Sequence, residues 1–408
     1  MFFKSRLLAY NVHFGFSLGL YLAVVAIFFI DKGVDLWLLG VVLGAGSVVT
    51  AVMELPLGSL ADQYGRLRIF RIGLGLAIIA LAPLAFSNSL LIFILSAMLN
   101  GIARALHSGS VDAWYVQELH ARGAADKVER YAGHMSAALC IGVAAGASVG
   151  GYIPAAMPDL GAISGTEWNP IFAVFSALVL LLLSYGLFYE GENHDQQPDR
   201  NPVAGQLRQT LVQSAHNPFV LELLITIAMA GLAMVALEFF WQPRLRQIVP
   251  DISYAVFGWM TAGYFIMGAL GSVLIGPLAK ALRLSPTAQV RLVPVFLLAA
   301  LLALGWADHA AGFVLLYLGF MLLYAMLYPA VFTQTNRFAG NQNRSTMQSL
   351  ISLSFRFGCG MIVALTFVLQ SISISALWLG IALFGLVLII GKNLFMRRYA
   401  EPEIEASD

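Results

Sequence analysis

Charge is scarce in this chain. Only 11% of its 408 residues are charged, whereas 59% are hydrophobic and the mean hydropathy is +0.80. A soluble domain carries about 25% charged residues. The composition therefore excludes an ordinary soluble globular protein and predicts an integral membrane protein.

Several kinds of chemical site are missing as well. The two cysteines, Cys140 and Cys359, lie within apolar runs, which argues against a disulfide framework. The pattern G-x-x-x-x-G-K-S/T does not occur, so ATP is not the expected energy source. The histidines show no metal-ligand spacing, and no hydrolytic triad or catalytic carboxylate pair is visible. We expect no metal site, no nucleic-acid partner and no enzymatic activity, with an intramembrane enzyme as a remote alternative.

What the sequence has in abundance is long apolar runs. A helix needs about 20 apolar residues to cross the hydrocarbon core of a bilayer, and the alternating segments of a β-barrel are absent. The runs predict twelve transmembrane helices, at 7–30, 36–58, 69–87, 89–112, 131–156, 170–189, 219–242, 255–279, 290–307, 310–333, 347–370 and 374–395.

The positively charged residues indicate how these helices are oriented. If the N-terminus lies in the cytoplasm, most of the 23 Lys and Arg residues fall in cytoplasmic loops and tails. Only Lys32, Arg244 and Arg246 fall outside, as expected from the excess of positive charge on the cytoplasmic side of membrane proteins. We therefore predict that both termini are cytoplasmic. We expect a monomer in the lipid bilayer of a cell membrane, with the bacterial inner membrane as its location.

The longest polar stretch divides the chain into two parts. Residues 190–217 are rich in charged residues and proline, which predicts a flexible cytoplasmic linker. The linker separates an N-terminal six-helix half (1–189) from a C-terminal six-helix half (218–395), and residues 396–408 form a cytoplasmic tail. Duplicated halves are typical of transporters that alternate access to a central site.

An eleven-residue motif closes the second apolar run: Gly58-Ser-Leu-Ala-Asp62-Gln-Tyr-Gly65-Arg66-Leu-Arg68. Glycine permits a tight reversal, and the arginines favour the cytoplasmic side. The motif resembles the signature loop between helices two and three of the major facilitator superfamily of secondary transporters; the alternative is an ordinary Gly/Arg turn. The resemblance covers essentially the whole chain. It implies an all-α membrane fold of two pseudo-symmetric halves, transport driven by an ion gradient, and a gating role for Gly58, Asp62, Gly65, Arg66 and Arg68.

The fifth apolar run carries glycines at a spacing of four. Gly142, Gly146 and Gly150 fall on one helical stripe, with Gly151 beside it, and small residues of this kind let a neighbouring helix approach closely. The segment resembles the helix-five motif of drug:proton antiporters, although Ala147 stands where that family has proline. The resemblance implies export, and the alternative is a stripe that serves packing alone.

Of the charged residues within the predicted helices or at their cytoplasmic edge, we single out four: Glu54, Arg104, Asp112 and Arg356. A charge in the spanning region costs at least a few kcal/mol unless it is paired or hydrated. These residues are therefore candidates for proton coupling and gating. An arginine in helix four is also characteristic of proton-coupled members of the family that the chain resembles.

Depth along the helices indicates partners for Glu54. Glu54 precedes Asp62, and Arg104 precedes Asp112, by about two helical turns, or about 12 Å. Glu54 can therefore pair with Arg104, or with Arg356 at a similar depth, and both partners stay open. Because burial and a paired arginine shift the pKa of a carboxyl group in opposite directions, Glu54 is the first candidate for a proton-responsive group. Asp112 is the second.

Contacts of the two aspartates would hold the cytoplasmic side together. We expect Asp112 beside Arg66, and Asp62 beside Arg344 at the start of helix eleven, where the helix dipole favours a carboxylate.

Three other acidic residues rank lower. Glu238 precedes an aromatic cluster at the outer end of helix seven, where an interfacial position and a functional role are equally compatible with the sequence. Glu222 lies near the cytoplasmic edge of the same helix, and Asp31 is expected in water at the end of helix one.

The resemblance implies that helices one, four, seven and ten line a central cavity. Two stripes at helical spacing are candidates for its wall: Asn11, Phe14, Ser17 and Tyr21 on helix one, and Tyr317, Met321, Tyr324 and Tyr328 on helix ten. Such stripes also serve packing, but buried tyrosine hydroxyls need partners, and a hydrated cavity supplies them. Aromatic and methionine walls with few fixed charges favour lipophilic compounds.

These features predict a proton-coupled exporter of drug-like or lipophilic small molecules, that is, a multidrug-resistance antiporter that needs the proton gradient and no cofactor. The alternative is a transporter of a specific polar metabolite with the same fold.

Overall fold

The computed structural model describes residues 2–107, 110–121, 123, 128–161, 163–188, 217–339, 344–368 and 372–396. These residues form helices joined by short connections, and no strand occurs among them. Helices are the expected outcome for apolar segments in a bilayer, because a helix satisfies its own peptide groups where no water can do so. The predicted all-α architecture is confirmed for this part of the chain.

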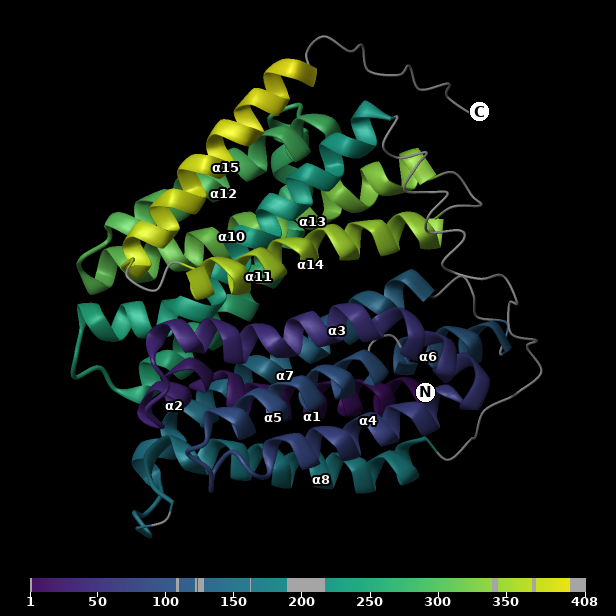
Figure 1. Cartoon of the computed structure of the whole chain (residues 1–408). Coiled ribbons are helices and arrows are strands. Elements are labelled where there is room, and N and C mark those ends of the chain that lie inside the picture. Colours follow the sequence, from purple (N-terminus) through teal and green to yellow (C-terminus); the bar gives the residue numbers. More distant parts are fainter. Residues whose placement is uncertain are drawn as a thin grey trace.

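A first group of helices, purple to blue in Figure 1, precedes residue 189. Its members are α1 (Phe2–Leu22), α2 (Val25–Asp31), α3 (Leu36–Tyr64), α4 (Arg66–Leu81), α5 (Leu90–His107), α6 (Ser110–Ala121), α7 (Val128–Ala156), the short 3₁₀ helix η2 (Gly165–Glu167) and α8 (Trp168–Leu187). Predicted helix one is divided into α1 and α2 by a break after Leu22.

A second group, teal to yellow in Figure 1, follows residue 216. Three of its helices begin at a capping side chain, since Asn217, Ser253 and Ser285 accept hydrogen bonds from N–H groups of the first turn. The group consists of α10 (Pro218–Ile248), α11 (Tyr254–Ala281), α12 (Pro286–Trp306), α13 (Ala310–Ala339), α14 (Arg344–Val368) and α15 (Ile374–Met396).

By length and hydropathy, 10 helical segments in the described part of the chain could cross a membrane. α4, with 16 residues, and the apolar part of α14, Leu350–Thr366, are shorter. Each predicted apolar run falls on a helix, and the chain is a multi-pass membrane protein. The number of twelve spans stays a prediction.

The predicted signature loop is mostly helical. α3 continues through Gly58 and Asp62 to Tyr64, and α4 begins at Arg66, so Gly65 alone separates the two helices. Gly65 has a φ of +95°, which residues with a Cβ rarely adopt. The reversal therefore depends on a single glycine, and the prediction of a loop beginning at Gly58 was wrong in its extent.

The apolar cores of the two groups differ in extent. α10–α15 supply nearly all of one continuous cluster of buried side chains, which includes Leu297, Phe320 and Trp378. α1–α8 bury their side chains in smaller, separate clusters, one around Phe70 and another around Phe93. The described buried side chains of the first group therefore form several clusters, whereas those of the second group fall mainly into one.

The two groups pack against each other mainly along α3 with α14 and α7 with α11. α3 and α14 lie side by side in the middle of Figure 1. Gly40 and Gly44 of α3 lie directly against Thr366 and Val363 of α14, so the helices approach closely there. These contacts enclose a space between the groups.

Candidate functional site

A cavity of about 450 Å³ lies between the two groups of helices. Its volume is within the range of pockets that hold small-molecule ligands. The first group contributes residues of α1–α5 and α8, and the second contributes residues of α10, α11 and α14. Aromatic rings from both groups line it: Phe14, Tyr21, Phe29, Phe239, Phe265 and Phe355.

Two charged side chains of opposite sign face this cavity from opposite groups of helices. Arg104 comes from α5 and Glu238 from α10. Both are exposed, and neither forms an ion pair or hydrogen bond with another described residue. From Met229 to Pro243, every residue of α10 except Glu238 is buried. The helix therefore presents one carboxylate to the cavity along an otherwise covered stretch.

Glu238 thus lines the cavity, so of the two possibilities that the sequence left open for it, an interfacial position and a functional one, the structure favours the second. The expectation of few fixed charges on the wall was wrong, since Arg356 lines the cavity together with Arg104 and Glu238. Asn100 and Ser47 add polar groups to it.

Glu54 pairs with Arg356. The carboxylate Oε2 of Glu54 accepts a hydrogen bond from Nη2 of Arg356 at 2.5 Å, and the two side chains are 32% and 21% exposed. Arg356 also reaches Ser352 Oγ, at 3.4 Å from its Nε. Of the two partners that the sequence left open, the structure places Arg356 at Glu54. The pair joins α3 to α14 and therefore ties the two groups of helices together.

The predicted wall of helix one is partly correct. Phe14, Ser17 and Tyr21 line the cavity. Ser17 Oγ also lies 2.6 Å from Ser176 Oγ on α8. Asn11 instead points into the first group, where its Nδ2 donates to Leu7 O.

The predicted stripe on helix ten serves another purpose. Tyr317 and Met321 of α13 are buried in the core of the second group, where the Tyr317 ring lies 4.9 Å from Trp241 between centroids. Tyr324 packs against the same core, and Tyr328 is 70% exposed. None of the four is among the residues lining the cavity. A stripe at helical spacing is compatible with either role, and here its first three residues belong to the core of the second group.

The glycines of α7 lie against two other helices. A Cβ at Gly142 or Gly146 would lie 2.1 Å from a backbone oxygen of α1, of Val12 and Phe16 respectively. Gly150 meets α1 in the same way, whereas Gly151 faces α11, where a Cβ would lie 2.9 Å from Gly258 Cα. The expected close approach is present. It joins α7 to α1 within one group and to α11 in the other.

Parts of the signature motif and its predicted contacts lie outside the described side chains. This applies to the side chains of Asp62, Asp112 and Arg344, so their predicted contacts stay predictions. Arg66 is partly buried and Arg68 is exposed at the start of α4.

Asp31 connects the two groups at the end of α2. Its Oδ1 accepts from Nη1 of Arg246 at 2.6 Å, and its Oδ2 accepts from Tyr254 Oη at 3.1 Å and from Thr166 Oγ1 at 3.3 Å. Arg246 lies in the last turn of α10, and Tyr254 is the first residue of α11. Asp31 was expected in water. Arg246, at the same predicted depth, was the signal that could have found this contact.

Gln242 of α10 occupies the break between α1 and α2. Its Oε1 accepts from the N–H of Ala26 at 3.0 Å and Ile27 at 3.3 Å, and its Nε2 donates to the carbonyls of Leu22 at 3.2 Å and Ala23 at 3.0 Å. A broken helix leaves peptide groups that need partners in a bilayer. Here a side chain of the other group supplies them.

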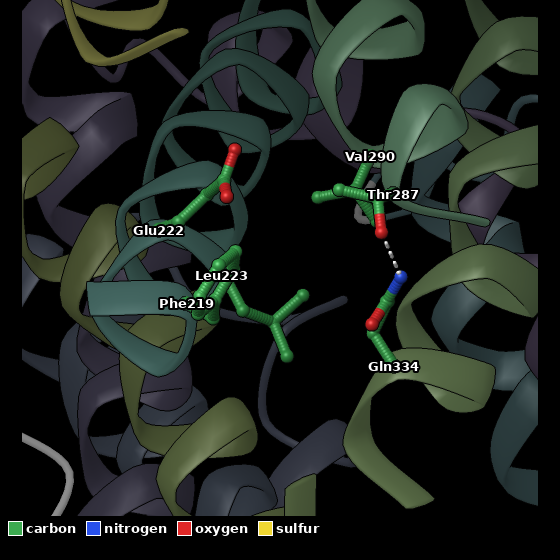
Figure 2. Close-up of a pocket in the computed structure, with 6 residues that line it drawn as sticks. All are labelled: Phe219, Glu222, Leu223, Thr287, Val290 and Gln334. Atoms are coloured by element: carbon green, nitrogen blue, oxygen red, sulfur yellow. Dashed lines mark hydrogen bonds between the residues drawn. The ribbon is translucent and has the colours of Figure 1, made fainter. Parts of the chain in front are cut away.

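A second, much smaller cavity lies within the second group, between α10, α12 and α13 (Figure 2). Figure 2 shows Gln334 donating to Thr287, at 2.7 Å between Nε2 and Oγ1, across from Phe219 and Leu223. About 10 Å³ is open, which suffices for at most one water molecule. This cavity is therefore too small for a substrate.

Glu222, on the wall of the small cavity, belongs to a buried ion cluster. Its two oxygens accept from Arg291 Nε at 2.8 Å and Nη2 at 3.1 Å, and Lys392 Nζ lies 3.4 Å from Oε1. Lys392 also donates to Thr226 at 2.7 Å. Glu222 is only 4% exposed, so the cluster ties α10, α12 and α15 together inside the core.

Apolar helices of membrane-spanning length around a charged cavity define a membrane protein that can hold a small solute between its two parts. The chain belongs to the Major Facilitator Superfamily, whose family model matches residues 8–363. It is therefore a transporter of a small-molecule substrate and not an enzyme. A comparison with curated proteins gives no match.

Solved structures agree with this fold. A crystal structure of the nucleoside transporter NupG has a TM-score of 0.75 and 16% sequence identity, with 98% of this chain and 100% of that chain covered. A bacterial homolog of the human lysosomal transporter Spinster, in an inward-facing and unoccupied conformation, has a TM-score of 0.72 and 12% identity, with 98% of each chain covered. At this identity the likeness establishes the fold and not the substrate.

Proposed function

We propose that this protein is a secondary transporter that moves a small polar molecule with charged groups across the membrane by alternating access. The observation that carries this proposal is the pair of opposed charges on the cavity wall, Arg104 and Glu238, one from each group of helices. A charge inside the spanning region is costly unless it has a purpose or a partner. A substrate with an anionic and a cationic group would supply both partners.

The same arrangement supports alternating access. Because Arg104 and Glu238 come from different groups, a substrate that binds both favours a state in which the groups approach each other. We propose that the moving units are the halves 1–189 and 218–395, joined by the linker 190–217 and followed by the tail 396–408. α4 and α14 would complete twelve spans, with both termini cytoplasmic.

Contacts near Asp31 and the likeness to an inward-facing structure support a cavity that opens toward the cytoplasm. In this proposal the signature residues Gly58, Asp62, Gly65, Arg66 and Arg68 control closure on that side. A monomer in a bacterial inner membrane fits the proposal.

Export of drug-like compounds is the second candidate, favoured by the six aromatic residues on the cavity wall. The other support for export, the glycine motif of α7, is weaker. Packing of α7 against α1 and α11 accounts for Gly142, Gly146, Gly150 and Gly151. The likeness to NupG, a nucleoside transporter, favours a specific polar metabolite.

A substrate panel separates the two candidates. Purified protein is tested for ligand-induced thermal stabilisation by uridine, phenylalanine, glucose and ethidium, followed by uptake or efflux in proteoliposomes. We expect stabilisation by a charged or zwitterionic compound, with loss of binding in Glu238→Gln and Arg104→Gln. Asp308→Asn, at an exposed loop carboxylate, is the control. Export of ethidium without binding of any polar compound would support the drug exporter instead.

We further propose coupling to the proton gradient, with Glu54 as the first responsive carboxylate and Asp112 as the second. Separation of the halves would break the Glu54–Arg356 pair, and loss of this positive neighbour would favour protonation of Glu54. Glu54→Gln should therefore abolish substrate-evoked proton release from purified protein while substrate binding survives. Unchanged proton release in this variant would transfer the role to Asp112.

A further inference from the structure

The main cavity extends beyond the space between the two groups of helices. It reaches into the first group as far as α4 and α8, where its wall consists of Leu74, Ala77, Leu81, Ala173, Ala177 and Leu180. We call this extension the chamber. All six residues are aliphatic, and α4 and α8 pack against each other behind them.

Three of the six chamber residues are small, namely the alanines at 77, 173 and 177. Larger side chains at these positions would reduce the open volume. The corresponding helices of the second group, α12 and α15, carry Leu297, Leu301 and Trp378 at full burial in a continuous core. Natural interiors are close-packed, and an open apolar volume loses contacts. The chamber therefore has a cost that occupation by an apolar group would remove.

The chamber is continuous with the charged part of the cavity. Arg104 and Asn100 of α5 line the same cavity as the chamber residues, and Glu238 faces it from α10. One molecule can therefore place charged groups between Arg104 and Glu238 and an apolar chain against the chamber residues of α4 and α8. The total of about 450 Å³ lies in the lower part of the range for small-molecule pockets, which suits a ligand with one short chain.

We infer that the substrate is a single-chain zwitterionic amphiphile. Its anionic group lies at Arg104, its cationic group at Glu238, and its hydrocarbon chain in the chamber. This inference rests on the proposed function and adds the chain to the charged head that the proposed function requires.

Acylcarnitines with acyl chains of two, four, six and eight carbons test both parts separately. Each has a carboxylate, a quaternary ammonium group and one chain. Binding is measured by calorimetry with the full-length protein in lipid nanodiscs. Burial of one CH₂ is worth a factor of about four in affinity. We expect affinity to rise by about fourfold per CH₂ until the chamber is full.

Ala177→Leu fills the chamber and should remove the dependence on chain length. Ala77→Val on α4 tests the opposite wall, should Ala177→Leu fail to fold. Ala137→Leu, at an exposed position of α7, is the matched control and should keep the dependence. Partition of the longer chains into the nanodisc lipid is the same for all of these variants. A difference between Ala137→Leu and the chamber variants therefore reports binding to the protein.

Glu238→Gln and Arg104→Gln should weaken binding of all chain lengths by a similar factor. If the two-carbon compound depends on these charges but chain length has no effect, the chamber inference is overturned and the proposed function stands. If affinity rises with chain length independently of both charges, the proposed function is overturned. A chain-length dependence that survives Ala177→Leu and Ala77→Val also overturns the inference.

Discussion

The third and sixth predicted transmembrane helices of each half are α4 and α8 in the first half and α12 and α15 in the second. They bury their apolar faces in different ways. In the second half, α12 and α15 place Leu301 and Trp378 in one continuous core. In the first half, α4 and α8 place Leu81 and Ala177 on the wall of a cavity. The difference shows that part of the apolar surface of α4 and α8 borders a cavity that a ligand can use, whereas α12 and α15 line no part of that cavity.

Backbone packing is similar in both halves. A Cβ at Gly146 of α7 would lie 2.1 Å from Phe16 O of α1, and one at Gly358 of α14 would lie 2.4 Å from Ala228 O of α10. These helix pairs occupy equivalent places in the order of the two halves. The halves thus share their close helix contacts and differ in the volume of the side chains around them.

The largest effect is expected where the halves are alike. Gly146→Leu places a side chain where even a Cβ meets backbone, so it should separate α7 from α1 and abolish transport and most folded protein. Gly133→Leu on the same helix is the control, because a Cβ there meets nothing within 4 Å. Transport by reconstituted protein and the yield of monodisperse protein are the measurements. Normal transport by Gly146→Leu would show that this contact is dispensable.

The second largest effect tests the core of the second half. Glu222→Gln leaves Arg291 and Lys392 without their carboxylate in a buried site, which should lower the free energy of unfolding by about 3–5 kcal/mol. The same change at Glu238, on the same helix but exposed to the cavity, should leave this free energy nearly unchanged. Denaturant unfolding in detergent measures both. Equal destabilisation by the two variants would contradict the distinction between core and cavity.

A third prediction compares the two halves directly. Leu301→Ala removes a fully buried side chain and should cost about 2–5 kcal/mol of unfolding free energy. Leu81→Ala removes a side chain that already borders a cavity, so the loss should be clearly smaller. The same unfolding assay measures the difference. If Leu81→Ala costs as much as Leu301→Ala, the first half is packed as tightly as the second.

Much of the fold follows from local sequence features. Apolar runs predict the helices because a bilayer leaves no other way to satisfy the backbone, and Gly65 marks the reversal before α4 because that position needs a positive φ. The positions of charged residues along the predicted helices narrowed the partner of Glu54 to Arg104 or Arg356. The choice of Arg356 required the packing of α3 on α14, which no local pattern contains.

The site was harder to predict for a physical reason. Glu222 and Glu238 are the same residue type on one helix, yet one is in an ion cluster and the other faces the cavity. Tyr317 lies on a stripe that would suit either a core or a cavity. In each case the role of the side chain depends on which residues of neighbouring helices lie against it. The break in helix one contains no proline or glycine that would predict it. The side chain that hydrogen-bonds to its peptide groups, Gln242, comes from the other half.

The smallest expected effect concerns the contact that joins the halves at Asp31. The pair with Arg246 is 29% and 27% exposed, and exposed ion pairs contribute about 0.2–1 kcal/mol. Asp31→Asn should therefore increase the population open at this end by a factor of about 1.4–5. Tyr254 can still donate to the amide oxygen, so the change should be partial.

Spin labels at Asn88→Cys and Asp251→Cys, which are exposed positions of the first and second halves, report this population by pulsed distance measurements after both native cysteines are replaced by serine. Asp308→Asn is the matched control, because Asp308 pairs with His309 inside the second half alone. We expect a longer-distance population in Asp31→Asn and none in Asp308→Asn. Identical distance distributions would mean that the contacts of Asp31 do not hold the two halves together at this end.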